Sequence, residues 1–229
     1  MEGAVYATAS PRYPLGTLPM KKHGPDPREP APGDTGDLAR LVQRGDQAGF
    51  QELYDRVAPA LYAWLHLRTT GDSATSQDLQ DLLQEVWLQA LRRFESYDPA
   101  RSFRPWILGI TKNVLLQSYR KTSYALPRAQ GQSPSERQLE VVNCPDSVTS
   151  IGTRLAKDDA VQRFLAYVDE LAPEDRMLVL YCGLEEYTSA QAAARLQISA
   201  DAANKRWQSL RARMRENGVL RALAVEEGA

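Results

Sequence analysis

The sequence predicts an all-α protein with two small helical domains joined by a flexible linker. Apolar residues recur at helical spacing on both sides of the middle of the chain, and helix-capping residues stand before several of these runs. Residues 122–156 lose the periodicity and contain three prolines and two glycines. So long a stretch without periodicity does not fit inside one compact domain, so residues 122–157 are interpreted as the linker.

The overall composition is that of an ordinary globular protein. Of its 229 residues, 43% are hydrophobic and 25% are charged. No apolar run is long enough to span a membrane, and the N-terminus lacks the apolar core of a signal peptide, so we expect a cytoplasmic protein without membrane insertion. Cys144 and Cys182 lack metal-ligand spacing. We therefore expect two reduced thiols, no metal and no cofactor.

Both ends of the chain are predicted to be tails. Residues 1–36 are rich in proline and glycine and poor in large apolar residues. Such a segment cannot bury enough surface to offset its ordering entropy, so we expect disorder there. Within it, Met1 and Met20 both stay open as the start of the protein. Residues 218–229 are assigned to a C-terminal tail.

The charges are segregated along the chain although the net charge is only −1. An acidic segment, 72–98, precedes the basic segment 101–121, and the same order recurs in segments 158–186 and 199–221. A near-neutral protein does not coat nucleic acid by charge alone. The repeated order indicates two modules, each with one face for nucleic acid and another for a different partner.

The first domain, residues 37–121, is predicted to begin with two helices. Gly45 is expected to end the first helix and Asp46 to cap the second. Pro59 lies within the second apolar run and should kink or break it. The polar segment 69–77 is predicted to be a loop.

The next predicted helix covers residues 78–94. Its apolar face is rich in leucine and tryptophan and is wider than one packing stripe requires. Asp81, Gln84 and Glu85 stand beside this face. The combination leaves room for a partner surface, and the alternative is a plain core helix.

The basic segment 101–121 carries five cationic residues and no acidic one. Segment 95–105 is predicted to be a turn-rich loop because Arg104 precedes a proline, and a helix is predicted from Trp106 onward. Cations neutralise phosphates and exposed rings stack on unpaired bases, so this segment suits a nucleic-acid strand. The alternative is an amphipathic helix with a solvated basic face.

The second domain, residues 158–217, ends in a helix-turn-helix pattern. Pro173 fits the first turn of a helix, and Thr188 with Gln191 forms a capping box. A short turn follows, in which Ser199 can cap the last helix. That helix has a core stripe opposite a polar, basic face. The pattern predicts a helix presented to the major groove, against the alternative of a solvated basic helix.

With these segments placed, the chain resembles the sigma-70 family, in particular its small extracytoplasmic-function (ECF) sigma factors, which are initiation subunits of bacterial RNA polymerase. The resemblance rests on four segments: LVQRGDQAGFQELYDRVAP at 41–59, DLLQEVWLQAL at 81–91, RPWILGITKNVLLQSYRK at 104–121 and the helix-turn-helix. The resemblance covers residues 37–121, as sigma region 2, and 158–216, as region 4. It implies core RNA polymerase and promoter DNA as partners, and it leaves room for an anti-sigma factor.

The resemblance also implies three sets of contact residues. The set for the clamp helices of the largest polymerase subunit comprises Asp81, Leu82, Gln84, Glu85, Trp87 and Leu88. The set for opening and reading the −10 element comprises Phe103, Arg104, Trp106, Lys112, Asn113, Arg120 and Lys121. The set for the −35 element comprises Ser199, Asn204, Lys205, Arg206, Gln208 and Arg211. The flap of the second-largest subunit is a further implied contact.

Two positions depart from the family pattern. The turn into the last helix usually carries a Gly-Thr-Val-like run, and residues 201–203 are Asp-Ala-Ala instead. Asp201 would face a phosphate with the wrong sign, so we expect it to cap the helix. Gln197 replaces the usual turn glycine. The −35 specificity therefore does not transfer from relatives.

Two other classes of protein were weighed. A helix-turn-helix regulator with an N-terminal sensing domain accounts for residues 158–216, but it leaves the DLLQEVW segment and the aromatic-basic segment unexplained. An enzyme is not expected, because His23 and His66 are the only histidines and no phosphate loop, metal spacing or nucleophile elbow is present. Glu185 and Glu186 are expected to be solvated surface residues.

Overall fold

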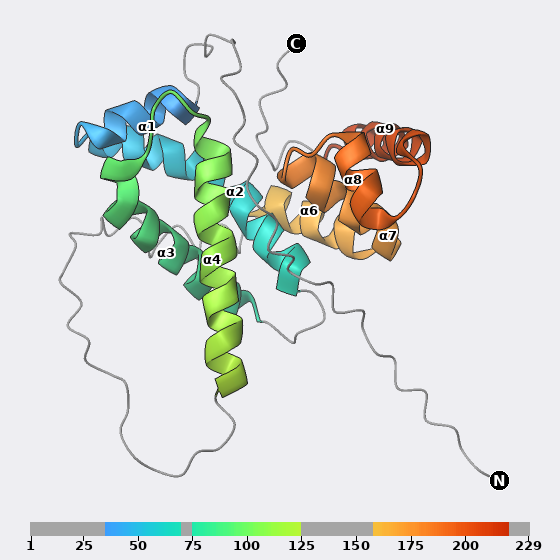
Figure 1. Cartoon of the computed structure of the whole chain (residues 1–229), viewed down its shortest axis with the longest axis horizontal. Helices are drawn as coiled ribbons and strands as arrows, with labels where there is room; N and C mark the ends of the chain where they lie inside the picture. Colours follow the sequence, from blue (N-terminus) through green and yellow to red (C-terminus); the bar gives the residue numbers. More distant parts are fainter. Residues whose placement is uncertain (1–34, 70–74, 125–157, 220–229) are drawn as a thin grey trace.

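The computed structural model describes residues 35–69, 75–124 and 158–219, with side chains up to Arg120 in the second range. All regular elements within these ranges are helical, which confirms the predicted all-α class. The helices form two groups that lie side by side (Figure 1). The predicted tail 1–36 and linker 122–157 lie almost wholly outside the described residues.

The two groups follow the order of the chain. The first group comprises α1 (Thr35–Gln43), α2 (Gln47–Thr69), α3 (Ser76–Arg93), the 3₁₀ turn η1 (Phe94–Ser96) and α4 (Phe103–Tyr124). The second group comprises α6 (Asp159–Asp169), α7 (Pro173–Leu178), the π-helical turn η2 (Val179–Leu184), α8 (Ser189–Leu196) and α9 (Ala200–Glu216).

The junction between α1 and α2 follows the predicted signals, whereas α2 itself departs from them. Gly45 has a φ of +85°, and the Asp46 Oδ1 atom accepts from the backbone N–H of Ala48 at 2.9 Å. These observations confirm that Gly45 ends the first helix and that Asp46 caps the second. We expected a kink or a break at Pro59, and the break is wrong, because α2 is one helix from Gln47 to Thr69. Pro59 lies in a stretch of α2 that is buried from Val57 to Leu65, and this packing offsets the missing backbone hydrogen bond.

Helices α3 and α4 both begin earlier than predicted. Thr75 caps α3 through a capping box with Asp78, and the helix begins at Ser76, two residues before the predicted start. Helix α4 begins at Phe103, so the expected non-helical conformation of Arg104 is wrong. Pro105 then falls in the first turn of α4, where a missing N–H group breaks no intrahelical hydrogen bond.

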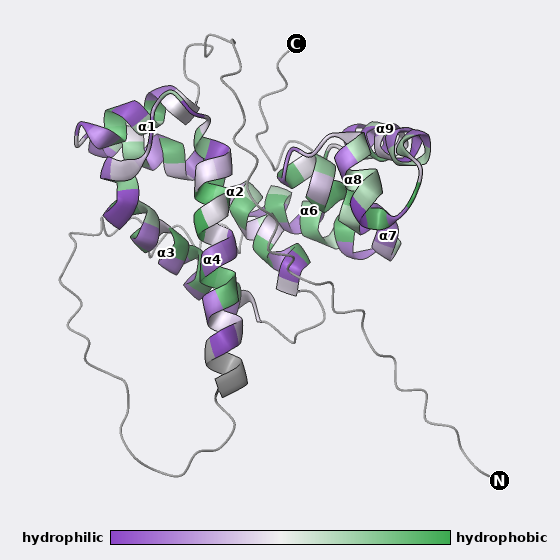
Figure 2. Cartoon of the chain, viewed as in Figure 1, coloured by the Kyte–Doolittle hydropathy of each residue, from purple (hydrophilic) through white to green (hydrophobic). Residues whose placement is uncertain are grey.

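An aromatic cluster forms the centre of the first group. The rings of Tyr54 on α2 and Trp87 on α3 stack with centroids 4.6 Å apart, and the Phe103 ring of α4 lies 6.4 Å from that of Trp87. All three side chains are fully buried. Figure 2 shows hydrophobic and hydrophilic residues alternating along the helices of this group. This cluster joins α2 to α3 and α4, the two helices that carry the predicted polymerase and −10 contact residues.

The helix-turn-helix in the second group is built as predicted, with one correction. Thr188 and Gln191 form the capping box of α8, and the Ser199 side chain accepts from the N–H of Ala202 at the start of α9. Asp201 lies in the first turn of α9 and is therefore not the cap that we expected. Gln197 has a φ of +56°, the left-handed conformation that the usual glycine would adopt.

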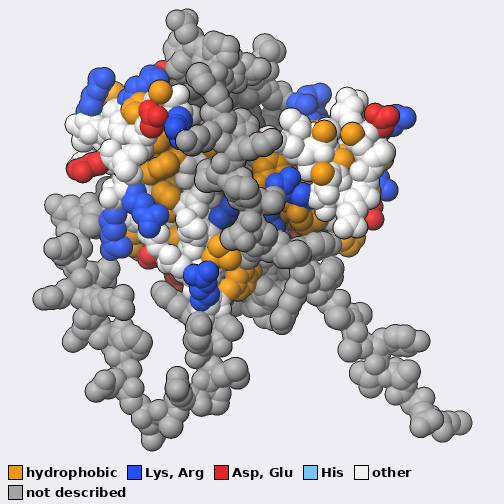
Figure 3. All heavy atoms as spheres, viewed as in Figure 1, with side chains coloured by type: hydrophobic (Ala, Val, Ile, Leu, Met, Phe, Trp, Pro, Cys, Tyr) orange, Lys and Arg blue, Asp and Glu red, His pale blue; other side chains and the backbone are white. Residues whose placement is uncertain are grey.

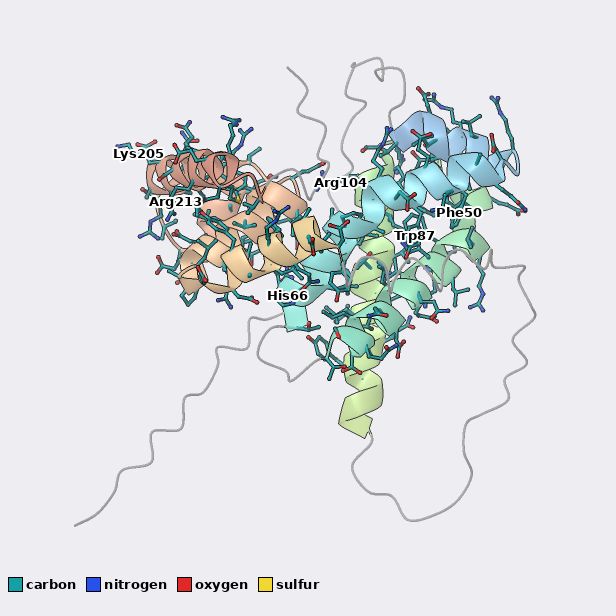
Figure 4. All side chains as sticks on the ribbon, turned by 180° about the vertical axis from the view of Figure 1, so that it is seen from behind. Phe50, His66, Trp87, Arg104, Lys205 and Arg213 are labelled. Atoms are coloured by element: carbon teal, nitrogen blue, oxygen red, sulfur yellow. The ribbon has the colours of Figure 1, made fainter. Side chains whose placement is uncertain are left out.

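The two helical groups are in contact. Helix α6 and the turn η2 pack against α2 of the first group. In Figure 4, His66 at the end of α2 lies where this helix meets the second group. His66 Nε2 is 2.9 Å from Asp169 Oδ2 of α6. The contact brings η2, which the sequence marked only as an apolar run, to the side of α2 and α4.

Candidate nucleic-acid interface

The predicted polymerase-contacting residues of α3 are not all on the surface. Asp81 is exposed, and Leu82, Gln84, Glu85 and Leu88 are partly buried. Trp87 is completely buried between α2 and α4. Its ring cannot touch another protein in this conformation, so its assignment as a contact residue is corrected to a core position. The sequence had left this alternative open, because a wide apolar face fits both roles.

The two aromatic residues predicted at the −10 contact differ in burial. Phe103 is completely buried in the aromatic cluster, so it cannot stack on a base in this conformation. Trp106 is partly exposed, and its ring lies 5.2 Å from that of Tyr97 and 5.5 Å from that of Phe94. Of these two rings, Trp106 is therefore the one that is partly accessible.

The polar residues predicted at the same contact also divide into two sets. Asn113 and Arg120 are exposed on α4, whereas Lys121 lies beyond the side chains that are described. Arg104 and Lys112 instead reach towards the second group. Arg104 Nη1 pairs with Glu186 Oε1 at 3.0 Å, and Arg104 Nη2 donates to the Gly183 carbonyl oxygen at 3.3 Å.

Lys112 pairs with a carboxylate that the sequence analysis had placed on the surface. Glu185 comes from the end of η2, and only 1% of its side chain is exposed. Lys112 Nζ donates to its Oε2 atom at 2.8 Å. Its Oε1 atom accepts from Arg68 Nη2 at 2.7 Å and from Trp64 Nε1 at 2.9 Å. The expectation of a solvated Glu185 is therefore wrong, while Glu186 beside it is exposed.

The charge of Glu185 is maintained by its partners. Burial by itself would raise the pKa of this carboxyl group, but the positive charges and hydrogen bonds of Lys112 and Arg68 outweigh that effect and lower the pKa below its ordinary value. Burial and the nearby Glu185 charge raise the pKa of Tyr187. Glu185 is therefore ionised at neutral pH and faces a neutral tyrosine.

Sequence reasoning missed Trp64, Arg68 and Glu185 as members of one site. Trp64 and Arg68 lie one turn apart on α2, but Glu185 follows Trp64 by 121 residues. The available signal was an acidic residue directly after the apolar run 177–184. That signal suggests a residue at the edge of a core, and it contains no information about the partner.

The predicted −35 residues share the outer face of α9. Ser199 is its N-cap, and Asn204, Lys205, Arg206, Gln208 and Arg211 are all exposed. Arg206 forms an ion pair with Glu174 of α7. Basic side chains lie along the outer rim of the second group in Figure 3, and Lys205 points away from the protein in Figure 4. The opposite stripe, with Ala203, Leu210 and Met214, is buried as predicted.

Comparison with known proteins accounts for this combination of helices. The family model for sigma-70 region 2 matches residues 53–124, which include α3 and α4. RNA polymerase sigma factor NccH of Alcaligenes xylosoxydans xylosoxydans is 27% identical over 77% of this chain and 90% of its own length. The chain belongs to the sigma-70 family. This sigma factor is also 28% identical to the ECF sigma factor SigE of Mycolicibacterium smegmatis, over 82% of this chain and 69% of that relative.

Two further proteins are similar to this chain. ECF sigma factor SigX of Bacillus subtilis is 24% identical over 66% of this chain and 73% of its own length. A solved structure of CnrH in complex with the cytosolic domain of CnrY is 22% identical and covers 83% of this chain and 98% of its own, with a TM-score of 0.39. That score is too low to establish a common arrangement of the two groups.

The assignment removes the enzyme alternative, because sigma factors are initiation factors. It also explains the region 2 sequence that a helix-turn-helix regulator leaves unexplained. Among the helices described here, none is both long and apolar enough to cross a membrane.

Proposed function

We propose that this sigma factor binds core RNA polymerase and directs promoter-specific initiation, with α9 reading the −35 element and α4 reading the −10 element and capturing the melted strand. The observation that supports this proposal is the placement of the exposed predicted residues. They lie on three different helices, α3, α4 and α9, of a chain that belongs to the sigma-70 family. Residues 37–121 would act as region 2 and residues 158–217 as region 4, connected by residues 122–157.

Helix α9 is suited to a duplex. Its exposed face combines amides, Asn204 and Gln208, with the cations Lys205 and Arg211. Amide and guanidinium groups recognise base edges in the major groove, and lysine neutralises phosphates. The Ser199 cap leaves the first turn of α9 at the surface, where the N-terminal end of a recognition helix meets the groove.

Helix α4 is suited to a separated strand. Asn113 is exposed for hydrogen bonds to unpaired bases, and Trp106 has an accessible ring edge. Flipping a base out of a duplex costs a few kcal/mol, and stacking it on an aromatic side chain returns about 1–3 kcal/mol. Strand opening is therefore close to balance, and contacts with polymerase decide it.

Helix α3 supplies the proposed polymerase contact. Asp81, Gln84 and Glu85, together with Leu82 and Leu88, would face the clamp helices of the largest subunit, and region 4 would meet the flap of the second-largest subunit. Trp87 supports this surface from beneath, because it is buried. An anti-sigma factor that covered these faces would act in the cytoplasm, where polymerase works.

Run-off transcription with core polymerase tests the proposal. A genomic template library transcribed with core enzyme should give promoter-dependent transcripts only when this chain is added. Asn113→Ala should retain polymerase binding but lose the permanganate reactivity of the −10 region. Gln162→Ala removes an exposed amide from α6 and is the matched control. The proposal is wrong if the chain yields no promoter-dependent transcript from the library.

A further inference from the structure

Three hydrogen-bond donors of the first group converge on one point between α2 and α4. They are the Trp64 indole N–H, the Arg68 guanidinium and the Lys112 ammonium, and we call them the anion socket. All three donate to the Glu185 carboxylate, at distances of 2.9, 2.7 and 2.8 Å. The socket belongs to the first group, whereas the carboxylate that fills it comes from the second.

Aromatic rings surround the charges of the socket. The Arg68 guanidinium carbon lies 5.3 Å from the centroid of Trp64, and Lys112 Nζ lies 6.0 Å from the same ring. On the second group, Tyr187 lies 5.8 Å from Lys112 Nζ. Rings that face a cation attract it and exclude water. The socket thus favours an anion, and the carboxylate that fills it is only 1% exposed, although Lys112 keeps 32% of its side chain exposed.

This arrangement is not an efficient way to hold two helical groups together. Removing charges from water costs several kcal/mol per ion, and a buried ion pair is often no more stabilising than apolar side chains of similar size. The contact between the groups has apolar alternatives on the same helices, since α2 is rich in buried alanine and leucine. Two cations and an indole N–H on one point are better explained by the recognition of an anion.

The chemistry and the position of the socket indicate which anion. Arginine, lysine and indole N–H groups that bind a carboxylate also bind the oxygens of a phosphodiester. Lys112 directly precedes Asn113 and points about 100° away from it around α4, so the socket lies at the side of the helix face that we propose as the strand path. A strand that follows this face passes beside the socket, where its backbone would present a phosphate.

We propose that the anion socket binds a backbone phosphodiester of the melted promoter strand, and that Glu185 occupies this site as its mimic while the two groups are in contact. The inference rests on the proposed function and adds Trp64 and Arg68 to the strand-binding residues. Glu185 and the strand compete for the same donors. The second group must therefore release the socket before the strand enters it.

Arg104 is also held by the second group, so its availability depends on the same contact between the groups. Its guanidinium is held by Glu186 and by the Gly183 carbonyl oxygen, next to Glu185 in sequence. Release of η2 from α2 would free Arg104 and Lys112 together. Two cations of the predicted −10 contact thus become available in one movement.

Fluorescence anisotropy of the full chain without polymerase tests the socket. The probe is a fluorescein-labelled 12-nucleotide deoxythymidine strand. Glu185→Ala and Glu185→Gln should bind it roughly a hundredfold more tightly than the unaltered chain, as expected if the free socket is a minor state of about one part in a hundred. Glu170→Ala removes an equal charge from an exposed position of the second group and should leave the affinity unchanged.

The same probe identifies the residues responsible. Adding Arg68→Ala and Lys112→Ala to Glu185→Ala should abolish the gain and reduce the slope of log affinity against log salt by about 0.7, because one single-strand phosphate contact is lost. Glu185→Gln retains the shape of the side chain, and circular dichroism checks that each variant folds. The inference is overturned if Glu185→Ala and Glu185→Gln bind no more tightly than Glu170→Ala, or if the gain persists without Arg68 and Lys112.

The outcomes separate this inference from the proposed function. Run-off activity without a gain for the Glu185 variants would overturn the socket and leave the sigma-factor mechanism intact. A gain through Arg68 and Lys112 in a chain without run-off activity would support the socket as a strand-binding site and remove its role at promoters.

Discussion

Helices α4 and α9 are both predicted to read DNA, but the structure presents them differently. The predicted residues of α9 after its cap are exposed, and Arg206 pairs within its own group, with Glu174. The predicted residues of α4 are divided between the core, the surface and the contact with the second group. The proposed duplex-reading face is therefore complete within one group, whereas the proposed strand-reading face shares its cations with the contact between the groups.

The two kinds of ion pair differ in strength for a physical reason. An exposed pair such as Arg206–Glu174 is screened by solvent and contributes little to stability, so DNA phosphates can replace the carboxylate easily. Breaking the buried Glu185 pair by removing one partner costs about 3–5 kcal/mol. We infer that α9 is available to DNA in the free chain, and that α4 requires a change in the contact between the groups.

The largest expected effect is a difference in stability between two variants of predicted DNA contacts, one with a buried side chain and one with an exposed side chain. Phe103→Ala should lower the free energy of unfolding by about 3–5 kcal/mol, because it empties a buried site in the aromatic cluster. Lys205→Ala on α9 should change it by less than about 0.5 kcal/mol, since its side chain is exposed. Urea unfolding measures both. Equal losses for the two variants would contradict the difference between α4 and α9.

The next effect concerns pH and the buried carboxylate. The pKa of Glu185 is lowered in the folded chain by Lys112 and Arg68 despite burial, so its stabilisation is present above the ordinary value of 4.5 and is lost as the pH falls through the lowered value. Glu185→Gln should cost roughly 3 kcal/mol at neutral pH by urea unfolding. The difference from the unaltered chain should shrink only below pH 4.5. A difference that disappears already between pH 7 and about 5.5 would contradict this assignment.

A smaller effect tests the exposed face of α9. Lys205→Ala should weaken the binding of nonspecific duplex DNA and reduce the slope of log affinity against log salt by about 0.9, the value for one phosphate contact. Titrations at several salt concentrations measure this slope. Lys205→Arg keeps the charge and should retain it. An unchanged slope for Lys205→Ala would remove this lysine from the duplex contact.

The smallest effect concerns the turn between α8 and α9. Gln197 adopts a left-handed conformation, with a φ of +56°, that is unfavourable for residues with a side chain. Gln197→Gly should raise the free energy of unfolding by about 0.5–1 kcal/mol, because relief of strain exceeds the added entropy of the unfolded chain. Gln197→Ala retains the strain and should give no gain. Thermal unfolding of the two variants makes the comparison, and a glycine variant no more stable than the alanine variant would be evidence against strain at this turn.

Signals between neighbouring residues were sufficient to predict much of the fold. Gly45, Asp46, Thr188 and Ser199 act as the local rules predict, because a helix end is satisfied by groups within a few residues. The buried stripe of α9 was predictable for the same reason, since its period is a property of one helix. Pro59 was the exception, because packing around α2 outweighed its local preference.

The contact residues were harder to predict, because a residue type suited to recognition is also suited to a core. Trp87 and Phe103 match the family motifs, yet both rings are buried by helices that are distant in sequence. Periodicity places a side chain on a face of its own helix, but it does not show what covers that face.

The amino-acid sequence thus determined the helices, their caps, the segregation of charge and the family. Each of these depends on residue types at short spacing, which a single chain segment contains. Only the tertiary structure decided which predicted contacts are exposed and that Glu185 enters a socket formed by Trp64, Arg68 and Lys112. The meeting of these residues depends on the packing of η2 against α2, and no local pattern in the sequence encodes it.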